Sequence, residues 1–140
     1  MTILDTNVLS ETMTDTPSPR VAAWMAEQRS SRELYLTTIT VAEILYGIEL
    51  LPHGQRREKL SAQADGTFAE DFAERILPFD WNAARMFAKI AAARRAQGRP
   101  IAEFDAQIAA VARANGAVLA TRNTSDFEGC GVRLINPWVD

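Results

Sequence analysis

The stretch that decides the fold is the first ten residues, Met1-Thr2-Ile3-Leu4-Asp5-Thr6-Asn7-Val8-Leu9-Ser10. A short apolar run ends at the carboxylate of Asp5, and two small hydrogen-bonding residues follow before helical spacing begins. This pattern predicts a brief buried strand with Asp5 at its carboxyl end and a helix directly after it. In open α/β sheets ligands bind at that edge. Asp5 is therefore either a simple helix cap or part of a site at the edge of the sheet.

The size and composition are those of a folded globular protein. The chain has 140 residues, of which 47% are hydrophobic and 24% are charged, and this length predicts a single domain over residues 1–140. No apolar run approaches the roughly 20 residues of a membrane-spanning helix, and the N-terminus lacks the basic flank of a signal peptide. We therefore expect a cytoplasmic protein with no membrane contact.

The scarce residue types exclude several kinds of site. One cysteine, Cys130, cannot form a disulfide within the chain, and one histidine, His53, is too few for a Cys/His zinc cluster. The sequence contains no glycine-rich phosphate motif. The net charge of −3 argues against a non-specific nucleic-acid coat, so any contact with nucleic acid must be local.

Short apolar runs alternate with longer helical patterns along the rest of the chain. This alternation predicts an α/β fold of three layers, α/β/α, around a short, mostly parallel central sheet. After the first strand, the remaining strands are expected at residues 34–36, 76–79, 117–120 and 132–135. Helices are expected at residues 8–11, 19–28, 39–51, 56–75 (with a weak point at Gly66), 81–97 and 100–115.

Glu43 is unusual because of the helix in which it lies. The apolar residues of the helix at 39–51 occupy most of its circumference, so we expect the helix to be buried. Glu43 shares the remaining narrow sector with Thr40 and Gly47, and Gly47 would leave room beside it. A glutamate is rarely buried unless it is paired or binds a metal. The alternative is a partly exposed glutamate with a salt-bridge partner.

Two further acids follow in the second half of the chain. Asp105 lies in the first turn of a helix, where a carboxylate is also favourable near the positive helix end. Asp126 lies in the polar loop 121–127 after an apolar strand, and alone it would be an ordinary turn residue. Each of these acids therefore has a plain structural explanation when it is taken by itself.

Considered together, the four acids predict a metal site. In a parallel sheet, Asp5 and the loop carrying Asp126 lie at carboxyl strand ends, and Glu43 and Asp105 open onto the same edge. Four carboxylates would repel one another and would coexist as anions only around a cation. All-oxygen ligands suit Mg²⁺ or Mn²⁺, which favours hydrolysis of a phosphodiester. Nearby polar side chains could hold the water or another metal ligand: Thr6, Asn7, Thr121 and Asn123.

The successive motifs resemble those of PIN-domain ribonucleases, over essentially the whole chain and in the same order. The ending Asn136-Pro137-Trp138 is similar to the VapC toxin branch, particularly its FitB-like members. The motifs that carry the resemblance are Ile3-Leu4-Asp5-Thr6-Asn7, the Thr38-to-Gly47 helix with Glu43, Pro100-Ile101 leading to Asp105-Ala106-Gln107-Ile108-Ala109-Ala110, and Thr121-Arg122-Asn123-Thr124-Ser125-Asp126-Phe127.

The resemblance implies a metal-dependent endoribonuclease that acts as the toxin of a toxin–antitoxin pair. It implies that four acids surround one or two Mg²⁺ or Mn²⁺ ions, with Asp5 and Asp105 as the main ligands and Glu43 and Asp126 completing the cluster. Thr121 and Asn123 would help to position water. It also implies an RNA substrate, a homodimer, and a larger assembly with a cognate antitoxin whose tail blocks the site. For the additional acid Glu103 we expect a surface role.

Two other functions are consistent with parts of the sequence. An aspartate-nucleophile phosphatase would use Asp5, but such enzymes want a second acid two residues on, where Asn7 stands, and a lysine downstream, and none follows Lys89. A catalytically idle module that binds a partner protein or RNA is the second alternative. The densest basic region is either an RNA path or a solvated helix face; it comprises Arg85, Lys89, Arg94, Arg95 and Arg99.

Overall fold

The computed structural model of the protein describes residues 1–31 and 33–140. Its centre is a five-stranded sheet in the order β3-β2-β1-β4-β5, in which every neighbouring pair is parallel. The strands are β1 (Thr2–Leu4), β2 (Leu34–Thr37), β3 (Ile76–Leu77), β4 (Val118–Ala120) and β5 (Leu134–Ile135). The expected sheet is thus confirmed, with β1 in its middle.

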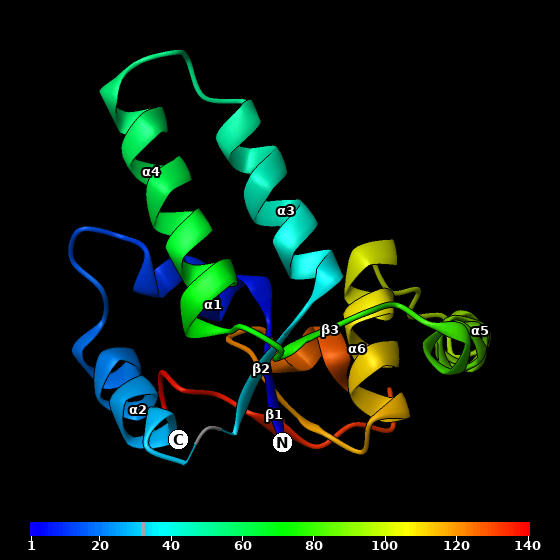
Figure 1. The fold of residues 1–140 in the computed structure, drawn as a ribbon. Coiled ribbons are helices and arrows are strands. Elements are labelled where there is room, and N and C mark those ends of the chain that lie inside the picture. Colours follow the sequence, from blue (N-terminus) through cyan, green and yellow to red (C-terminus); the bar gives the residue numbers. More distant parts are fainter. Residues whose placement is uncertain (32) are drawn as a thin grey trace.

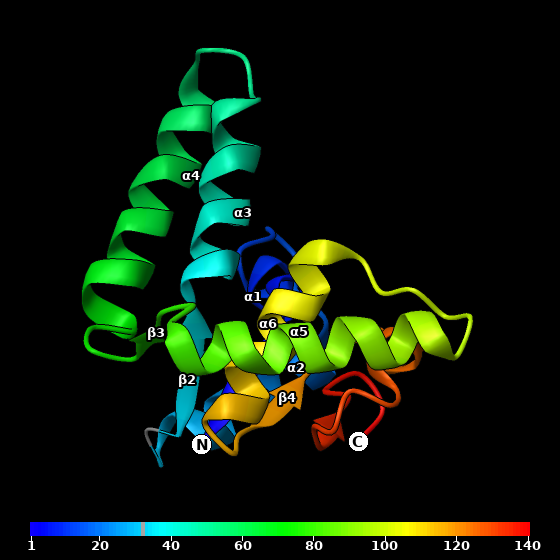
Figure 2. The same ribbon diagram turned by 90° about the vertical axis from the view of Figure 1, so that its right-hand side faces the viewer.

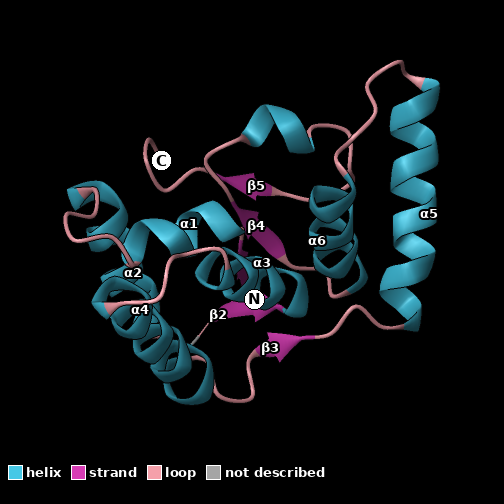
Figure 3. Cartoon of the chain, turned by 90° about the horizontal axis from the view of Figure 1, so that it is seen from above, coloured by secondary structure: helices cyan, strands magenta, loops and turns pink. Residues whose placement is uncertain are grey.

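Helices cover both faces of this sheet, as Figure 3 shows from above. They are α1 (Thr6–Thr12), α2 (Pro19–Arg29), α3 (Thr38–Glu49), α4 (Gln55–Gly66), α5 (Trp81–Ala96) and α6 (Glu103–Ala114), with a π-helical turn η1 (Thr67–Asp71) and a 3₁₀ turn η2 (Thr124–Phe127). The three-layer α/β/α prediction is therefore confirmed.

The two faces of β1 enter two separate hydrophobic cores, because successive strand residues point to opposite sides. Ile3 packs into the core beneath α5 and α6, with Ile90 and Ile108. Leu4 packs into the core beneath α1 and α2, with Val8 and Val21. A strand buried on both faces reads as an uninterrupted apolar run, which is what the sequence has before Asp5.

The expectation that α3 is buried is wrong for its outer half. Figures 1 and 2 show α3 and α4 side by side, projecting away from the sheet. Tyr46 and Leu50 are each 67% exposed, and a Cβ at Gly47 would meet no atom within 4 Å, so this glycine does not make room for a neighbour. A helical wheel records which sides are apolar, but it does not record whether the chain supplies anything to cover them.

Other differences concern where elements end. The helix expected over 56–75 stops at Gly66, its expected weak point, and continues only as the turn η1. β3 ends before Pro78, which has no N–H to donate to a neighbouring strand. β5 covers only Leu134–Ile135 of the expected 132–135. Within the described part of the chain, no helix is both long and apolar enough to span a bilayer.

The parallel sheet gathers several chain segments at one edge. β1 ends at Asp5, whose amide donates a 2.8 Å hydrogen bond to the Ala120 carbonyl at the end of β4. β2 ends at Thr37, which caps α3. The residues that follow three neighbouring strands therefore start from the same edge.

Candidate functional site

Asp5 is held rigidly at the carboxyl end of β1. It is 5% exposed and forms the N-cap of α1. One carboxylate oxygen, Oδ1, accepts a 2.8 Å hydrogen bond from the Thr6 amide, and the other, Oδ2, accepts a 2.7 Å hydrogen bond from the Thr121 hydroxyl. The two interpretations of Asp5 are compatible, because its side chain caps the helix while lying at the edge of the sheet.

The surroundings of Asp5 disfavour its negative charge. Burial raises the pKa of Asp5 from 3.8 to about 6, because an anion loses its hydration in the interior. The hydrogen bonds from Thr121 and Thr6 lower this pKa, while the charges of Asp105 and Glu43 raise it. The balance leaves a carboxylate that would gain from a nearby positive charge.

Glu43 is brought to Asp5 through Thr6. The Thr6 hydroxyl donates a 2.7 Å hydrogen bond to Glu43 Oε1. Its oxygen also lies 2.9 Å from the Thr40 hydroxyl, which must be the donor there because the hydrogen of Thr6 is already engaged. Thr6 thus contacts both acids, one through its amide and one through its side chain. Glu43 is half-buried and has no salt-bridge partner among residues 1–31 and 33–140.

Asp105 and Asp126 form the more open part of the acidic cluster. Burial raises the pKa of Asp105, and the charges of Asp126 and then Glu43 raise it further. Asp105 is half-buried in the first turn of α6, whereas Asp126 is exposed in η2. The structure therefore brings Asp126 close enough to Asp105, and Asp105 and Glu43 close enough to Asp5, for their charges to interact.

Three of the acids line one cavity of about 460 Å³. Asp5, Glu43 and Asp105 share it with Asn123 and with a polar face of α1, while Asp126 lies outside its lining. These polar residues are Asn7, Ser10 and Glu11 of α1, with Thr14 just beyond its C-terminal end. Of these four residues only Asn7 was predicted from the sequence, although the spacing i, i+3, i+4, i+7 from Asn7 is a signal that indicates the other three.

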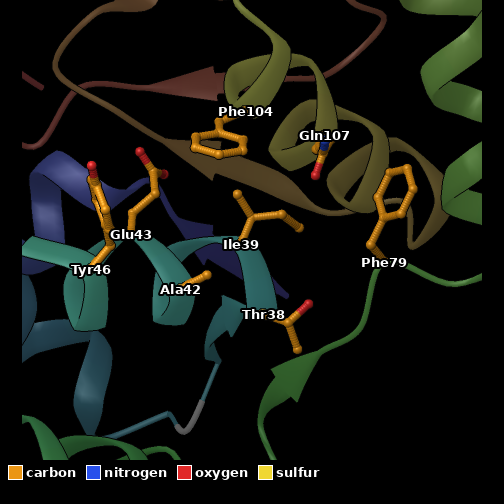
Figure 4. Close-up of a pocket in the computed structure, with 8 residues that line it drawn as sticks. All are labelled: Thr38, Ile39, Ala42, Glu43, Tyr46, Phe79, Phe104 and Gln107. Atoms are coloured by element: carbon orange, nitrogen blue, oxygen red, sulfur yellow. The ribbon is translucent and has the colours of Figure 1, made fainter. Parts of the chain in front are cut away.

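Glu43 also borders a second, apolar cavity of about 810 Å³. Figure 4 shows the Glu43 carboxylate between the rings of Tyr46 and Phe104, with Phe79 farther along the same cavity. Tyr46 and Phe104 are exposed. The acidic cavity is thus flanked by an exposed aromatic surface.

The polar residues expected to hold water have different surroundings. Thr121 is buried, donates its hydroxyl hydrogen to Asp5 and accepts a 3.1 Å hydrogen bond from the Asn123 amide. It therefore lies behind Asp5 and orients that carboxylate. Asn123 is exposed and lines the acidic cavity. Asn7 accepts a 3.4 Å hydrogen bond from the Arg122 amide. Glu103 is exposed, as a surface role requires.

The donor atoms fit a hard divalent cation. They are carboxylate oxygens, which Mg²⁺ and Mn²⁺ prefer, and no lysine or arginine that the structure describes lies within salt-bridge distance of the four acids. As the described side chains stand, no three acidic, His or Cys residues are gathered closely enough to enclose an ion. Carboxylates that lie near one another with no lysine or arginine beside them are chemically suited to bind a divalent cation.

The prediction that the basic residues of the region at 85–99 form an exposed surface is wrong for Arg94. Arg94 is 4% exposed and lies neither on a solvated face nor on an RNA path. Its guanidinium donates to the backbone carbonyls of Arg99, Asp126 and Glu128. The other members of the region are exposed: Arg85, Lys89, Arg95 and Arg99.

Comparisons with known proteins give a consistent result. The sequence matches the family model described as "PIN domain" over residues 2–129. It is 43% identical to the plasmid stability protein StbB of Pseudomonas syringae pv. tomato, over 99% of each chain. It is 42% identical to the VapC ribonuclease Y4jK of Sinorhizobium fredii, over 99% of this chain and 98% of that protein, and 39% identical to the toxin FitB of Neisseria gonorrhoeae, over 100% of each. The crystal structure of FitAcB from Neisseria gonorrhoeae resembles the fold with a TM-score of 0.90 at 38% identity, covering 100% of both chains.

Proposed function

The chain belongs to the PIN domain family, and on this premise we propose that it is a metal-dependent endoribonuclease acting as the toxin of a toxin–antitoxin pair. The observation that carries the proposal is the acidic cavity at the carboxyl edge of the sheet, lined by Asp5, Glu43 and Asp105. Similarity over 98% or more of relatives named as a ribonuclease and a toxin supports it.

Asp5 and Asp105 are the main ligands of Mg²⁺ or Mn²⁺ in this proposal, and Glu43 and Asp126 complete the set. When bound, such a cation polarises the scissile phosphate, helps to ionise a water and stabilises charge on the leaving oxygen. Asp5 offers an oxygen in a fixed position because Thr6 and Thr121 hold its carboxylate. Because the pKa of Asp5 is raised to about 6, a proton competes with the cation for this carboxylate mainly below that pH.

The polar residues of the cavity divide the remaining work. Thr6 fixes Glu43 relative to Asp5 through its hydroxyl. Thr121 orients Asp5 from behind, so it acts on water only through that carboxylate. Asn123 lines the cavity and is placed to hold a water or a phosphate oxygen.

RNA is the substrate, and a cognate antitoxin is the regulatory partner. We also propose that residues 1–140 form one nuclease domain and that the protein is a homodimer, because a second copy would cover apolar side chains that the chain leaves exposed. They include Tyr46, Trp81 and Phe104. The cytoplasmic location expected from the sequence stays a prediction.

The proposal is tested by Asp5→Asn and Asp105→Asn, with Asp65→Asn on the exposed side of α4 as the matched control. We expect Asp5→Asn and Asp105→Asn each to lower the rate of RNA cleavage in Mn²⁺ by more than about 100-fold. Removing a group that only orients a metal ligand typically costs about 10–100-fold, and removing the ligand itself should cost more. Asp65→Asn should cleave like the wild type, and chelation of the metal should stop all cleavage.

Expression in a bacterial host gives a second readout of the same variants. The wild type and Asp65→Asn should arrest growth, and co-expression of the neighbouring reading frame should relieve the arrest. Equal cleavage by all variants would contradict the metal mechanism. Folded wild-type protein that neither cleaves RNA nor arrests growth would favour the idle binding module.

A further inference from the structure

We propose that Arg94 is a positioning residue that fixes the backbone of the loop carrying Asp126, and so sets the place of the outermost carboxylate of the site. The inference rests on the proposed function, since it gives Asp126 a metal to bind. It concerns residues that lie far apart in the sequence, on α5 and η2.

The contacts of Arg94 join three segments of the chain. Its Nε donates a 2.8 Å hydrogen bond to the Arg99 carbonyl. Its Nη1 donates to the Asp126 carbonyl at 2.8 Å and to the Glu128 carbonyl at 3.1 Å. One planar guanidinium therefore ties the end of α5 and the turn after it to both sides of Phe127, which is itself buried.

A buried arginine at this position is costly unless its donors are used. Arginine is almost never fully buried unless it is paired, and within residues 1–31 and 33–140 no carboxylate lies within salt-bridge distance of Arg94. Backbone carbonyl dipoles take the place of the anion. Only a group with several donors in a fixed fork can satisfy all three carbonyls at once, so the chemistry of arginine is matched to holding this loop.

Asp126 needs such support because it is held differently from Asp5. Both carboxylate oxygens of Asp5 accept hydrogen bonds, whereas Asp126 is exposed and is fixed through its backbone. Its amide donates to the Asn123 carbonyl at 3.0 Å, and its carbonyl accepts from Arg94. The position of its side chain therefore depends on the backbone contacts of the loop.

Arg99 supports the same loop from the surface. Its Nη2 donates a 3.2 Å hydrogen bond to the Ser125 carbonyl and lies 3.6 Å from the carboxylate of Glu128. Because Arg99 is exposed, its contribution should be smaller than that of Arg94. The pair gives one buried and one exposed contact to the loop, which can be removed separately.

The test is a double-mutant cycle on Mn²⁺ affinity, measured by titration calorimetry without RNA. The variants are Arg94→Met, Asp126→Asn and the double variant, with Arg95→Met, an exposed neighbour on α5, as the control. We expect Arg94→Met to weaken Mn²⁺ binding about tenfold, as is typical when a group that orients a ligand is lost. In the Asp126→Asn background the same change should weaken binding less than about twofold, because the carboxylate it positions is gone.

The cycle separates positioning from a general loss of structure. Melting temperatures are recorded for the wild type and all four variants. If Arg94 has only a general structural role, Arg94→Met should weaken Mn²⁺ binding equally in the wild-type and Asp126→Asn backgrounds. Equal losses, or wild-type affinity in a folded Arg94→Met, would overturn the inference. If wild-type protein binds no Mn²⁺ and cleaves no RNA, the proposed function itself fails, and Arg94 has no metal ligand to position.

Two milder variants decide the question if Arg94→Met does not fold. Arg94→Lys keeps the charge but cannot reach three carbonyls, and Arg99→Met removes only the surface contact. Each should weaken Mn²⁺ binding by about threefold in the wild-type background and should have no effect in the Asp126→Asn background, since both act through the same carboxylate. Unchanged affinity in both would overturn the inference.

Discussion

The acidic site has two sides that are built in different ways. On one side, Asp5 is buried with both carboxylate oxygens hydrogen-bonded, and Glu43 is tied to it through Thr6. On the other side, Asp105 is half-buried and Asp126 is exposed. The rigid side lies at the end of the central strand, and the open side lies on a helix start and a 3₁₀ turn.

The difference shows how one site can combine a buried, rigidly held carboxylate with more exposed ones. Asp5 is fixed by being buried, and burial makes its anionic form unfavourable in the absence of a nearby positive charge. Asp126 is exposed, so its carboxylate keeps its hydration and its negative charge is less unfavourable. Its position depends on backbone contacts such as the hydrogen bond from Arg94. Rigidity and an unfavourable negative charge therefore go together at Asp5, whereas Asp126 combines an exposed, hydrated charge with a position set by its backbone.

The largest expected effect concerns the stability of the metal-free protein as the pH changes. The folded state binds a proton at Asp5 more tightly than the unfolded state, because its pKa is raised from 3.8 to about 6. This contribution to stability is complete below about pH 4 and is lost as the pH rises through 6. Asp5→Asn should therefore match the wild type at pH 4 and exceed its free energy of unfolding by about 3 kcal/mol at pH 8.

Urea unfolding at both pH values measures this difference, with Asp65→Asn as the control that should show none. Saturating Mn²⁺ at pH 8 should narrow the gap by stabilising the wild type alone. A difference in the free energy of unfolding that stays constant from pH 4 to pH 8 would mean that burial does not raise the pKa of Asp5.

Sequence patterns predicted the rigid side better than the open side. The apolar run before Asp5 fixes a buried central strand, and strand–helix alternation places its end with those of its neighbours. These local signals were enough to predict the carboxyl edge of the sheet. They did not predict that Thr121 donates a hydrogen bond to Asp5, because a hydroxyl in a loop gives no indication of whether it faces water or a carboxylate 116 residues away.

The failures occurred where the decisive partner is distant or missing. Arg94 belongs to a basic run that is typical of a solvated face, and only the return of the Asp126 loop buries it. Tyr46 of α3 and Leu50, which directly follows it, are apolar side chains that nothing among residues 1–31 and 33–140 covers. Periodicity reports the chemistry of a helix face, but the fold decides what packs on it.

Thr121→Val tests whether the rigidity of Asp5 matters for metal binding. The variant removes a hydrogen bond that lowers the pKa of Asp5, so this pKa should rise further and a proton should compete better with the metal. We expect Mn²⁺ affinity at pH 7 to fall about tenfold or more, as measured by titration calorimetry. Thr124→Val, on the adjacent 3₁₀ turn, is the matched control. Wild-type affinity in Thr121→Val would show that Asp5 holds its position without this contact.

Asp126→Asn should have the smallest effect on the metal-free protein. Its side chain is exposed, so replacing the anion returns almost no hydration energy, and surface changes of this kind usually stay within about 0.5 kcal/mol. Urea unfolding at pH 8 should therefore place Asp126→Asn close to the wild type and well below Asp5→Asn. A gain comparable to that of Asp5→Asn would mean that the charge of Asp126 is as unfavourable as the buried one. The two sides would then differ only in how exposed their carboxylates are, and not in how much each negative charge destabilises the metal-free protein.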